Sequence, residues 1–520
     1  MKEENNNVFS FNSLSLRQEG PFLLVALMVA VLFFYAFSMA WPIRTGRDYG
    51  AYLEHYFGLK IAYTMFRPVG ASYILGWISE WPVVWIEAFF MLLYLAHLLT
   101  SYLTARYFGL MTARVVLVLL MMDLTVLAIF HRLDGYSLFC LAISTLSAAM
   151  VWLHRKENHY VSFFLGLMIV LPILMRQTGI VLFLYFLIPV VCFGINRFQI
   201  MRSMVMALGV MTGLMGIMTY NYVHFDRWSI SLSSGGNYIP TAIVYRMGPK
   251  FAEEYGPANR KLLQTIKEEL LVKDVYVENK VDINHFIRYS LDEYKFFDLF
   301  YLDKIHPGLV RDAAIESIKA RPVKFIKALV TSVWRMFVFD GLDPVILPDR
   351  VAHLALKLPR EPEIPFSYSM TPEVISQIEL PFHPAKIEDK PILEKSHKLQ
   401  MKIRGHGIYR VQVVFKYFVA SILPPMLFFL ALTFLLLFFI RSREVRLLGV
   451  LFAAALLIPL LSAVLNFLPE YRAPVDFLIL LAAVVGVRNV LAPAVHCNRS
   501  IKESALHPAS HEGSLIPHST

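Results

Sequence analysis

The chain has 520 residues, of which 57% are hydrophobic and only 17% are charged, and its mean hydropathy is +0.54. Soluble domains are about 45–50% apolar and about 25% charged, so this composition excludes an ordinary soluble protein and predicts many membrane helices. The net charge of +10 does not indicate a nucleic-acid partner, because much of the excess Lys and Arg lies in short loops between apolar segments.

The first apolar segment, Pro21–Ala40, is uncharged and has about the length of a bilayer crossing. It lacks a small-residue cleavage site, so we predict a membrane span rather than a cleaved signal. Nine further apolar segments follow, and each is predicted to be a helix because lipid excludes unpaired strand edges. They lie at roughly 83–104, 114–130, 135–153, 160–175, 177–195, 203–223, 412–440, 447–466 and 473–491. The segments 160–175 and 177–195 meet at "MRQTGI" and form either two crossings or one broken pair.

Loop charge predicts the orientation of these spans. If the ten spans alternate, basic residues gather on one side, at 154–156, 197–202 and 441–446, and the positive-inside rule makes that side cytoplasmic. We therefore predict an all-α polytopic membrane protein with about ten transmembrane helices. Its parts are a cytoplasmic N-terminus (1–20), an N-terminal transmembrane module (21–223) with an acidic first outer loop (41–62), an extracytoplasmic domain (224–410), C-terminal transmembrane helices (411–492) and a disordered cytoplasmic tail (493–520).

The predicted extracytoplasmic domain is helical first and loop-rich later. Residues 308–339 are amphipathic with helical spacing, whereas nine prolines occur from Pro344 to Pro391. The domain contains no cysteine and no Asn-x-Ser/Thr acceptor, which favours a bacterial plasma membrane over a eukaryotic secretory one.

Motifs of soluble enzymes are absent from the sequence, including the P-loop, the strand-linked GxGxxG, GxSxG and HExxH. Any chemistry must therefore come from charges at the membrane face. Asp48 lies just after the first span and is a candidate general base, with Glu54 close to two helical turns further on. The pair is also a candidate divalent-metal site, although no metal or other cofactor is required. A solvated loop that contacts lipid headgroups is the alternative reading.

Arginines also lie near the predicted outer ends of the spans. Guanidinium groups bind phosphate through two parallel hydrogen bonds, so these residues are candidate ligands of a lipid phosphate, with headgroup contact as the alternative. They are Arg47, Arg67, Arg176 and Arg472. Arg472 also lies four residues before Asp476, a spacing that predicts an i,i+4 ion pair.

Three further carboxylates are candidates for a function. Asp134 is either an N-cap of the following helix or a ligand of a sugar or acceptor, and Glu470 either orients Arg472 or faces the cavity. Asp123 lies in the middle of the segment 114–130, where we expect a protonated or hydrogen-bonded structural residue. Glu87 and His97 are either its partners or residues that line the cavity. A proton relay in a transporter is the alternative role for Asp123.

Five segments, in this order, resemble the GT-C superfamily of integral-membrane glycosyltransferases, in particular the branch of protein O-mannosyltransferases and the lipid A aminoarabinose transferase. They are "GRDYGAYL", "FRPVGASYILGWI", "FHRLDGYSLFCLAIS", "LPILMRQTGIVLFL" and "LPEYRAPVDFLILLAAVVG". Two features depart from the family pattern. Asp48 is followed by Tyr49 rather than by a second acid, and the arginine of the last segment is displaced by two positions.

The resemblance implies an inverting glycosyltransferase of the plasma (inner) membrane with its active site on the periplasmic or exterior face. It implies a polyprenyl-phosphate-linked sugar donor, a lipid, glycan or protein acceptor, Asp48 as base (with Glu54 as a candidate second acid), arginines on the lipid phosphate, and contacts from Asp134 and Glu470 to sugar or acceptor. No nucleic acid and no nucleotide take part. An O-antigen-type ligase or polymerase and a polytopic transporter or flippase are the alternative functions.

Overall fold

The computed structural model describes most of the predicted spans and part of the segment that follows them. The described residues are 13–40, 44–45, 52, 55–56, 68–79, 81–154, 156–226, 228–230, 238–247, 255–272, 277, 283, 299, 302, 305–338, 427–437, 442–465 and 471–506. Five predicted site residues lie outside them, namely Arg47, Asp48, Glu54, Arg67 and Glu470. The proline-rich stretch 344–391 and residues 507–520 also lie outside them.

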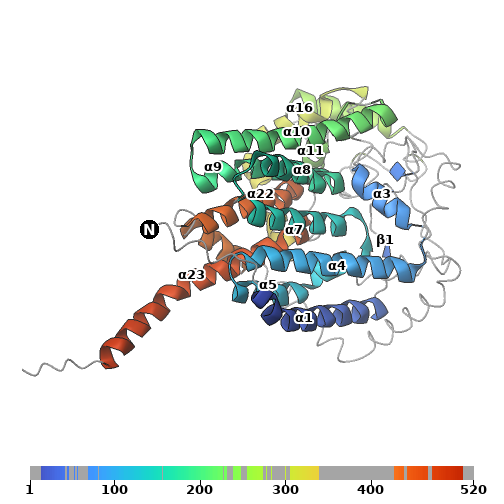
Figure 1. The fold of residues 1–520 in the computed structure, drawn as a ribbon. Helices are drawn as coiled ribbons and strands as arrows, with labels where there is room; N and C mark the ends of the chain where they lie inside the picture. The colour runs from blue at the N-terminus through green and yellow to red at the C-terminus, as the bar shows by residue number, and fades with distance from the viewer. Residues whose placement is uncertain are drawn as a thin grey trace, which may run out of the picture.

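The described chain is mostly helical and contains two strands of two residues each (Figure 1). In order, the elements up to residue 225 are α1 (Ser13–Ala40), β1 (Arg44–Thr45), α3 (Val69–Ile78), α4 (Val83–Arg106), α5 (Leu110–Met121), α6 (Leu124–Ile129), β2 (Arg132–Leu133), α7 (Gly135–Leu153), α8 (His159–Met175), the 3-10 helix η2 (Gln177–Leu187), α9 (Ile188–Phe193) and α10 (Arg197–Phe225). The later elements are α11 (Tyr238–Met247), α12 (Pro257–Thr265), η4 (Ile266–Leu270), α16 (Leu309–Ala320), α17 (Pro322–Val338), an apolar helix Leu427–Leu437, α22 (Arg443–Leu465) and α23 (Ala473–Leu506).

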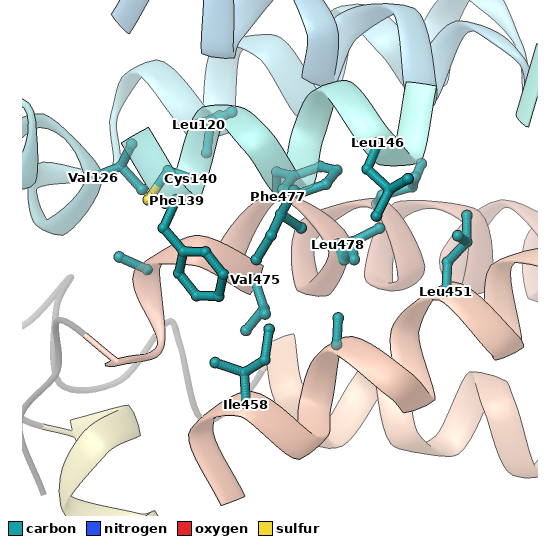
Figure 2. Close-up of a cluster of buried hydrophobic side chains, with 14 of the residues drawn as sticks. Leu120, Val126, Phe139, Cys140, Leu146, Leu451, Ile458, Val475, Phe477 and Leu478 are labelled. Carbon is teal, nitrogen blue, oxygen red and sulfur yellow. The ribbon is translucent and has the colours of Figure 1, made fainter. Parts of the chain in front are cut away.

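The long helices form two layers. In the first layer α1 packs on α4, α4 on α7, α7 on α8 and α8 on α10, and these helices run roughly parallel across the view of Figure 1. In the second layer α5 packs on α23, α23 on α22, and α22 on η2 and α9, and α7 contacts α23 between the layers. Figure 2 shows this central contact, where Phe139 of α7 lies near Val475 of α23 and Ile458 of α22. The main hydrophobic core therefore lies between the two helical layers.

Five of the described helices are long and apolar enough to cross a membrane. They are Glu19–Ser38, Val84–Arg106, Gly135–Leu153, Arg197–Phe225 and Arg443–Ser462. Shorter apolar helices occupy parts of the other predicted spans, including Leu110–Met121, His159–Met175 and Leu427–Leu437. The chain is thus a mostly helical protein of the kind that spans membranes.

Two predictions about helix extent were wrong. The segment 114–130 is not one continuous span, because α5 ends at Met121 and Asp123 caps the separate short helix α6. A side-chain carboxylate that binds free amide groups favours a new helix start over continuation of the old helix. The tail is not irregular from residue 493, since α23 continues to Leu506.

The loops predicted to be cytoplasmic meet at one end of the bundle. Arg202 at the start of α10 is 1% exposed and donates hydrogen bonds to the carbonyl oxygens of His154 (2.6 Å) and Lys156 (3.2 Å), just after α7. The guanidinium of Arg443, at the start of α22, lies 3.3 Å from the centre of the Phe193 ring at the end of α9. A cation beside the carboxyl end of a helix also interacts favourably with the helix dipole. These basic residues are therefore structural parts of one end of the bundle.

A second, smaller core is formed by residues after α10. Buried side chains of α11, α12 and α16 pack together, including Val244, Leu262, Val310 and Ala313. The half-buried Glu316 of α16 connects two of these helices, because its carboxylate accepts hydrogen bonds from the amides of Ala258 and Asn259 (3.0 Å each) at the start of α12. Burial raises the pKa of Glu316, but these hydrogen bonds outweigh burial and the net pKa is lowered.

This carboxylate predicts an acid-sensitive contact between α12 and α16. A folded-state pKa below the unfolded value means that Glu316 stabilises the fold above the unfolded pKa of about 4.3, and that this contribution is lost as the pH falls below it. We expect Glu316→Gln to lower stability by about 1–2 kcal/mol at pH 7, with the difference from wild type shrinking only as the pH falls from about 4 to about 3. Thermal unfolding in detergent across this pH range measures it. Glu268→Gln, at an exposed residue bonded to the Gln264 side chain, is the control, and a constant difference at all pH values would contradict the role.

Candidate functional site

Two predicted outer loops are joined by a short parallel β-pairing. Arg44 pairs with Arg132 and Thr45 pairs with Leu133. The first strand follows α1, and the second lies between α6 and α7. The pairing therefore fixes the beginning of the acidic loop 41–62 beside the entrance of α7, where Asp134 follows directly after β2. Asp48 is three residues beyond Thr45 and outside the described residues.

Asp134 is the N-cap of α7. One carboxylate oxygen accepts a hydrogen bond from the amide of Tyr136 at 2.8 Å, and the other lies 3.1 Å from Nε of Arg132. Asp134 is 1% exposed and Arg132 is 7% exposed. This confirms the capping role that the sequence offered as one of two alternatives. The same contacts hold the charged end of β2 against the first turn of α7.

Arg176 lies in the break between α8 and η2, where its backbone is extended. It is 8% exposed, and its guanidinium lies 3.6 Å from the centre of the Tyr136 ring and 5.7 Å from that of Tyr471. The two tyrosine rings are 5.5 Å apart in an edge-to-face arrangement. A desolvated guanidinium on an aromatic face is held by a favourable cation–π interaction. The ends of α7, α8 and α23 thus meet around one cation and two phenol rings.

Gly135 permits a further close approach at this point. A side-chain carbon at Gly135 would collide with the hydroxyl of Tyr52 and would lie 3.1 Å from the carbonyl oxygen of Met175. Tyr52 belongs to the acidic loop and is fully buried. The first outer loop therefore contacts the start of α7 beside Arg176, as well as through β1.

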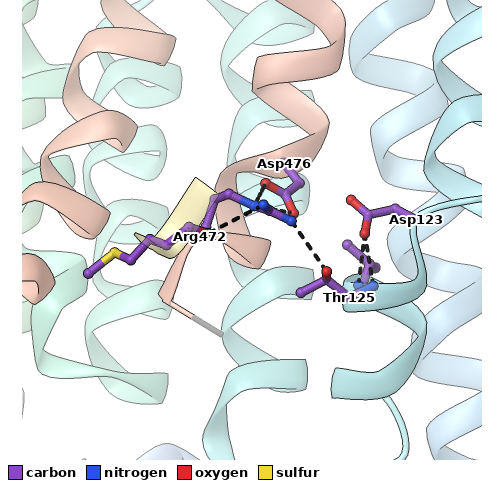
Figure 3. A network of polar contacts seen from close by, with 6 residues as sticks. Asp123, Thr125, Arg472 and Asp476 are labelled. Carbon is purple, nitrogen blue, oxygen red and sulfur yellow. Dashed lines mark hydrogen bonds and ion pairs between the residues drawn. The ribbon is translucent and has the colours of Figure 1, made fainter. Parts of the chain in front are cut away.

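Arg472 precedes α23 and is held in a buried polar network (Figure 3). Its Nε lies 2.8 and 3.1 Å from the two carboxylate oxygens of Asp476, while its terminal nitrogens donate to the carbonyl of Met336 and the hydroxyl of Thr125, at 3.3 Å each. Arg472 is 2% exposed and Asp476 is 4% exposed. The sequence predicted this ion pair from its i,i+4 spacing. All three nitrogens thus contact protein groups in this structure.

Asp123 lies at the edge of this network, with its carboxyl beside that of Asp476. Its Oδ1 accepts hydrogen bonds from the amides of Thr125 (2.9 Å) and Val126 (3.3 Å), which makes it the N-cap of α6. The expectation of a hydrogen-bonded structural residue is confirmed. His97, which the sequence offered as a partner, is instead bonded to the Ser144 hydroxyl through Nδ1 at 3.0 Å.

Sequence reasoning missed two residue types that organise this end of the bundle. Tyr136 and Tyr471 stack around Arg176, and the signal that could have found them is an aromatic residue beside each charged helix start. His131 is buried and lies 2.9 Å from the Ser38 hydroxyl and 2.9 Å from the Leu127 carbonyl. Because a carbonyl only accepts, Nδ1 carries the proton and Nε2 accepts from Ser38, which connects α1 to α6.

Three of the predicted site residues lie within the described part of the chain, and all three lie near the entrances of α7 and α23. They are Asp134, Arg176 and Arg472. Among the residues that the structure describes, no group of three or more His, Cys, Asp or Glu is arranged to hold a metal ion. The candidate metal pair Asp48 and Glu54 lies outside those residues. Comparison of the chain with protein-family models, with curated proteins and with solved structures finds no match.

The Arg472 network predicts a large stability loss when its cation is removed. Arg472→Met would leave the carboxyls of Asp476 and Asp123 facing each other in a buried site, and we expect destabilisation of about 3–5 kcal/mol. Thermal unfolding of the purified protein in detergent measures this. The matched control is Arg311→Met, because Arg311 forms an exposed pair with Asp312 (3.0 Å) and should change little. Equal effects of the two substitutions would contradict a structural role for the buried pair.

Proposed function

We propose that the chain is a GT-C-like glycosyltransferase of the plasma (inner) membrane with about ten spans. It transfers a sugar from a polyprenyl-phosphate-linked donor to a lipid, glycan or protein acceptor on the non-cytoplasmic face. The extracytoplasmic domain, 224–410 in this proposal, includes the second core of α11, α12 and α16. The basic end of the bundle then faces the cytoplasm, in agreement with the positive-inside rule.

The observation that carries the proposal is the pairing of β1 with β2. It holds the beginning of the acidic loop beside Asp134 and Arg176, which lie near Tyr471 and Arg472 in the late segment. A transferase needs a base, an acceptor site and cations for a leaving phosphate within a few ångströms of one another. Loops far apart in the sequence converge here, at the end of the bundle opposite the arginines that are predicted to be cytoplasmic. This convergence supports such a site.

In the proposed reaction, the Asp48 carboxylate takes the proton from the acceptor hydroxyl or amine. The acceptor atom then bonds to the anomeric carbon from the face opposite the phosphate, the bond between that carbon and the phosphate oxygen breaks, and the polyprenyl phosphate leaves with the electron pair. Arginine stabilises the charge that develops on the leaving phosphate. Arg47, Arg67 and Arg176 are proposed for this role, with Glu54 assisting the base and Glu470 contacting sugar or acceptor.

Arg472 and Asp134 have a positioning role in this proposal. The guanidinium of Arg472 is directed at Asp476, Thr125 and Met336, so it fixes the entrance of α23 rather than reaching outward. Asp134 caps α7 and holds Arg132. Both residues place Tyr471 and Tyr136 around Arg176, so Arg176 is the described arginine that we propose for the phosphate.

The general-base role predicts that Asp48→Asn lowers transfer by about 10²–10⁴-fold without loss of folded protein, because an amide cannot accept the proton. Mass spectrometry of surface lipids and glycans from cells with and without the gene first identifies the product as a mass change of one sugar residue. The same product is then quantified in cells that produce the variant. Asp312→Asn, at an exposed residue of α16, is the matched control and should retain transfer. Full transfer by Asp48→Asn would contradict the proposed base and would favour a ligase or polymerase that works without an acidic first loop.

A transporter is the second candidate, because the network of Asp123, Asp476 and Arg472 places ionisable groups between helices of a membrane protein. In that case Asp123→Asn should stop function while Asp48→Asn leaves it intact. For a transferase we expect the opposite, with Asp48→Asn stopping function and Asp123→Asn leaving it intact. Measuring both variants therefore distinguishes the two functions.

A further inference from the structure

Helix α17 presents three distinct faces along its length. One face packs inward through Leu329, Val333 and the fully buried Met336. A second face is apolar but exposed, and consists of Val323, Ile326, Val330 and Trp334, which are 77%, 58%, 61% and 50% exposed. These positions are spaced by three, four and four residues and therefore form one stripe along the helix. We call these four residues the α17 stripe.

The third face of α17 is polar. It carries Lys324, Lys327 and Thr331, of which Lys327 and Thr331 are exposed. The polar face therefore borders the α17 stripe directly. Lysines beside an exposed apolar stripe are characteristic of helices that lie in the plane of a membrane surface, where cations contact lipid headgroups.

The α17 stripe continues onto neighbouring apolar helices. The Trp334 ring lies 6.4 Å from the Phe429 ring of the helix Leu427–Leu437, and Phe429 is itself 52% exposed. Leu460 and Leu461 of α22 are also exposed, and Leu460 takes part in an apolar depression of about 310 Å³ with residues of α17 and Leu427–Leu437. Outward-facing leucines of a membrane-spanning helix contact acyl chains, and Leu460 and Leu461 are exposed on such a helix. The apolar side chains of α17 that share this surface therefore lie at a similar depth in the bilayer.

We propose that α17 is an interfacial helix whose stripe lies in the acyl-chain region of the bilayer and whose lysine face points towards the headgroups. The occupant of the apolar surface formed by the α17 stripe, Phe429 and Leu460 is the hydrocarbon of bilayer lipid. Burial of apolar surface contributes about 25 cal/mol per Å², so four large side chains in a row would be costly to leave in water. Helix α17, within the predicted extracytoplasmic segment 224–410, is then embedded in the bilayer surface.

This placement connects the lipid to the polar network. The carbonyl of Met336, near the end of α17, accepts a hydrogen bond from Arg472 at 3.3 Å. In this proposal lipid holds one side of α17, and Arg472 holds its end. Helix α17 therefore fixes the entrance of α23 relative to the membrane surface. The proposal does not depend on the chemistry of the site, because it concerns only the depth of α17.

Site-directed spin labelling tests the depth of α17. In a chain with Cys497→Ser, the remaining cysteines Cys140 and Cys192 are 0% and 2% exposed, so a nitroxide can be attached selectively to Val330→Cys or to Lys327→Cys. The labelled proteins are reconstituted in nanodiscs of phosphatidylethanolamine and phosphatidylglycerol. Collision rates with oxygen, which partitions into lipid, and with a water-soluble nickel chelate are measured for each label.

The proposal predicts that the ratio of oxygen to nickel collisions is several-fold higher at Val330 than at Lys327. High nickel accessibility at both positions would show that α17 lies in water and would overturn the proposal. Low accessibility of Val330 to both reagents would also overturn it, because a protein rather than lipid would then cover the stripe. Ile326→Cys provides a second label on the same face, so that a folding defect of one variant does not decide the result.

Discussion

The buried ion pair of Arg472 and Asp476 is the constraint on which one end of the bundle depends. A guanidinium removed from water is costly unless its hydrogen bonds are satisfied by the protein, and a membrane interior offers no water to replace them. Satisfying Arg472 requires the Thr125 hydroxyl of α6 and the Met336 carbonyl of α17, so three segments far apart in the sequence must be brought together. The break of the third predicted span at Asp123 belongs to the same arrangement, because capping of α6 places Thr125 beside Arg472.

The aromatic contacts around Arg176 lie next to this ion pair. Tyr471 precedes Arg472 directly, and with Tyr136 it surrounds the Arg176 guanidinium. The β-pairing of Arg44–Thr45 with Arg132–Leu133 then adds the start of the acidic loop. Rigid aromatic and backbone contacts hold charged groups at fixed positions, which is what a site for group transfer requires. The proposed chemistry thus relies on structural residues that do not themselves react.

Hydrophobic runs predicted most of the helices, because the length of an apolar segment is set by the bilayer. Helices α4 and α7 begin and end within about two residues of their predicted bounds, 83–104 and 135–153. The division of α5 from α6 was missed, because a single aspartate changes mean hydropathy little while its carboxylate ends one helix and starts another. The pairing of Arg472 with Asp476 followed from i,i+4 spacing. The stacking of Arg176 on Tyr136 and Tyr471 did not, since it depends on tertiary packing of three helix ends.

The proposed orientation puts the loops joined around Arg176, and the segment after α10, on the opposite side of the membrane from the arginine-rich end. Cysteine labelling of intact cells with a membrane-impermeant maleimide tests it most directly, with one cysteine at Glu157, between α7 and α8, and one at the exposed Asp312 of α16. In a Cys497→Ser chain, this orientation predicts that Asp312→Cys is labelled in intact cells and that Glu157→Cys is labelled only after the membrane is permeabilised. Labelling of Glu157→Cys in intact cells, with Asp312→Cys protected, would contradict the orientation and the proposed site with it.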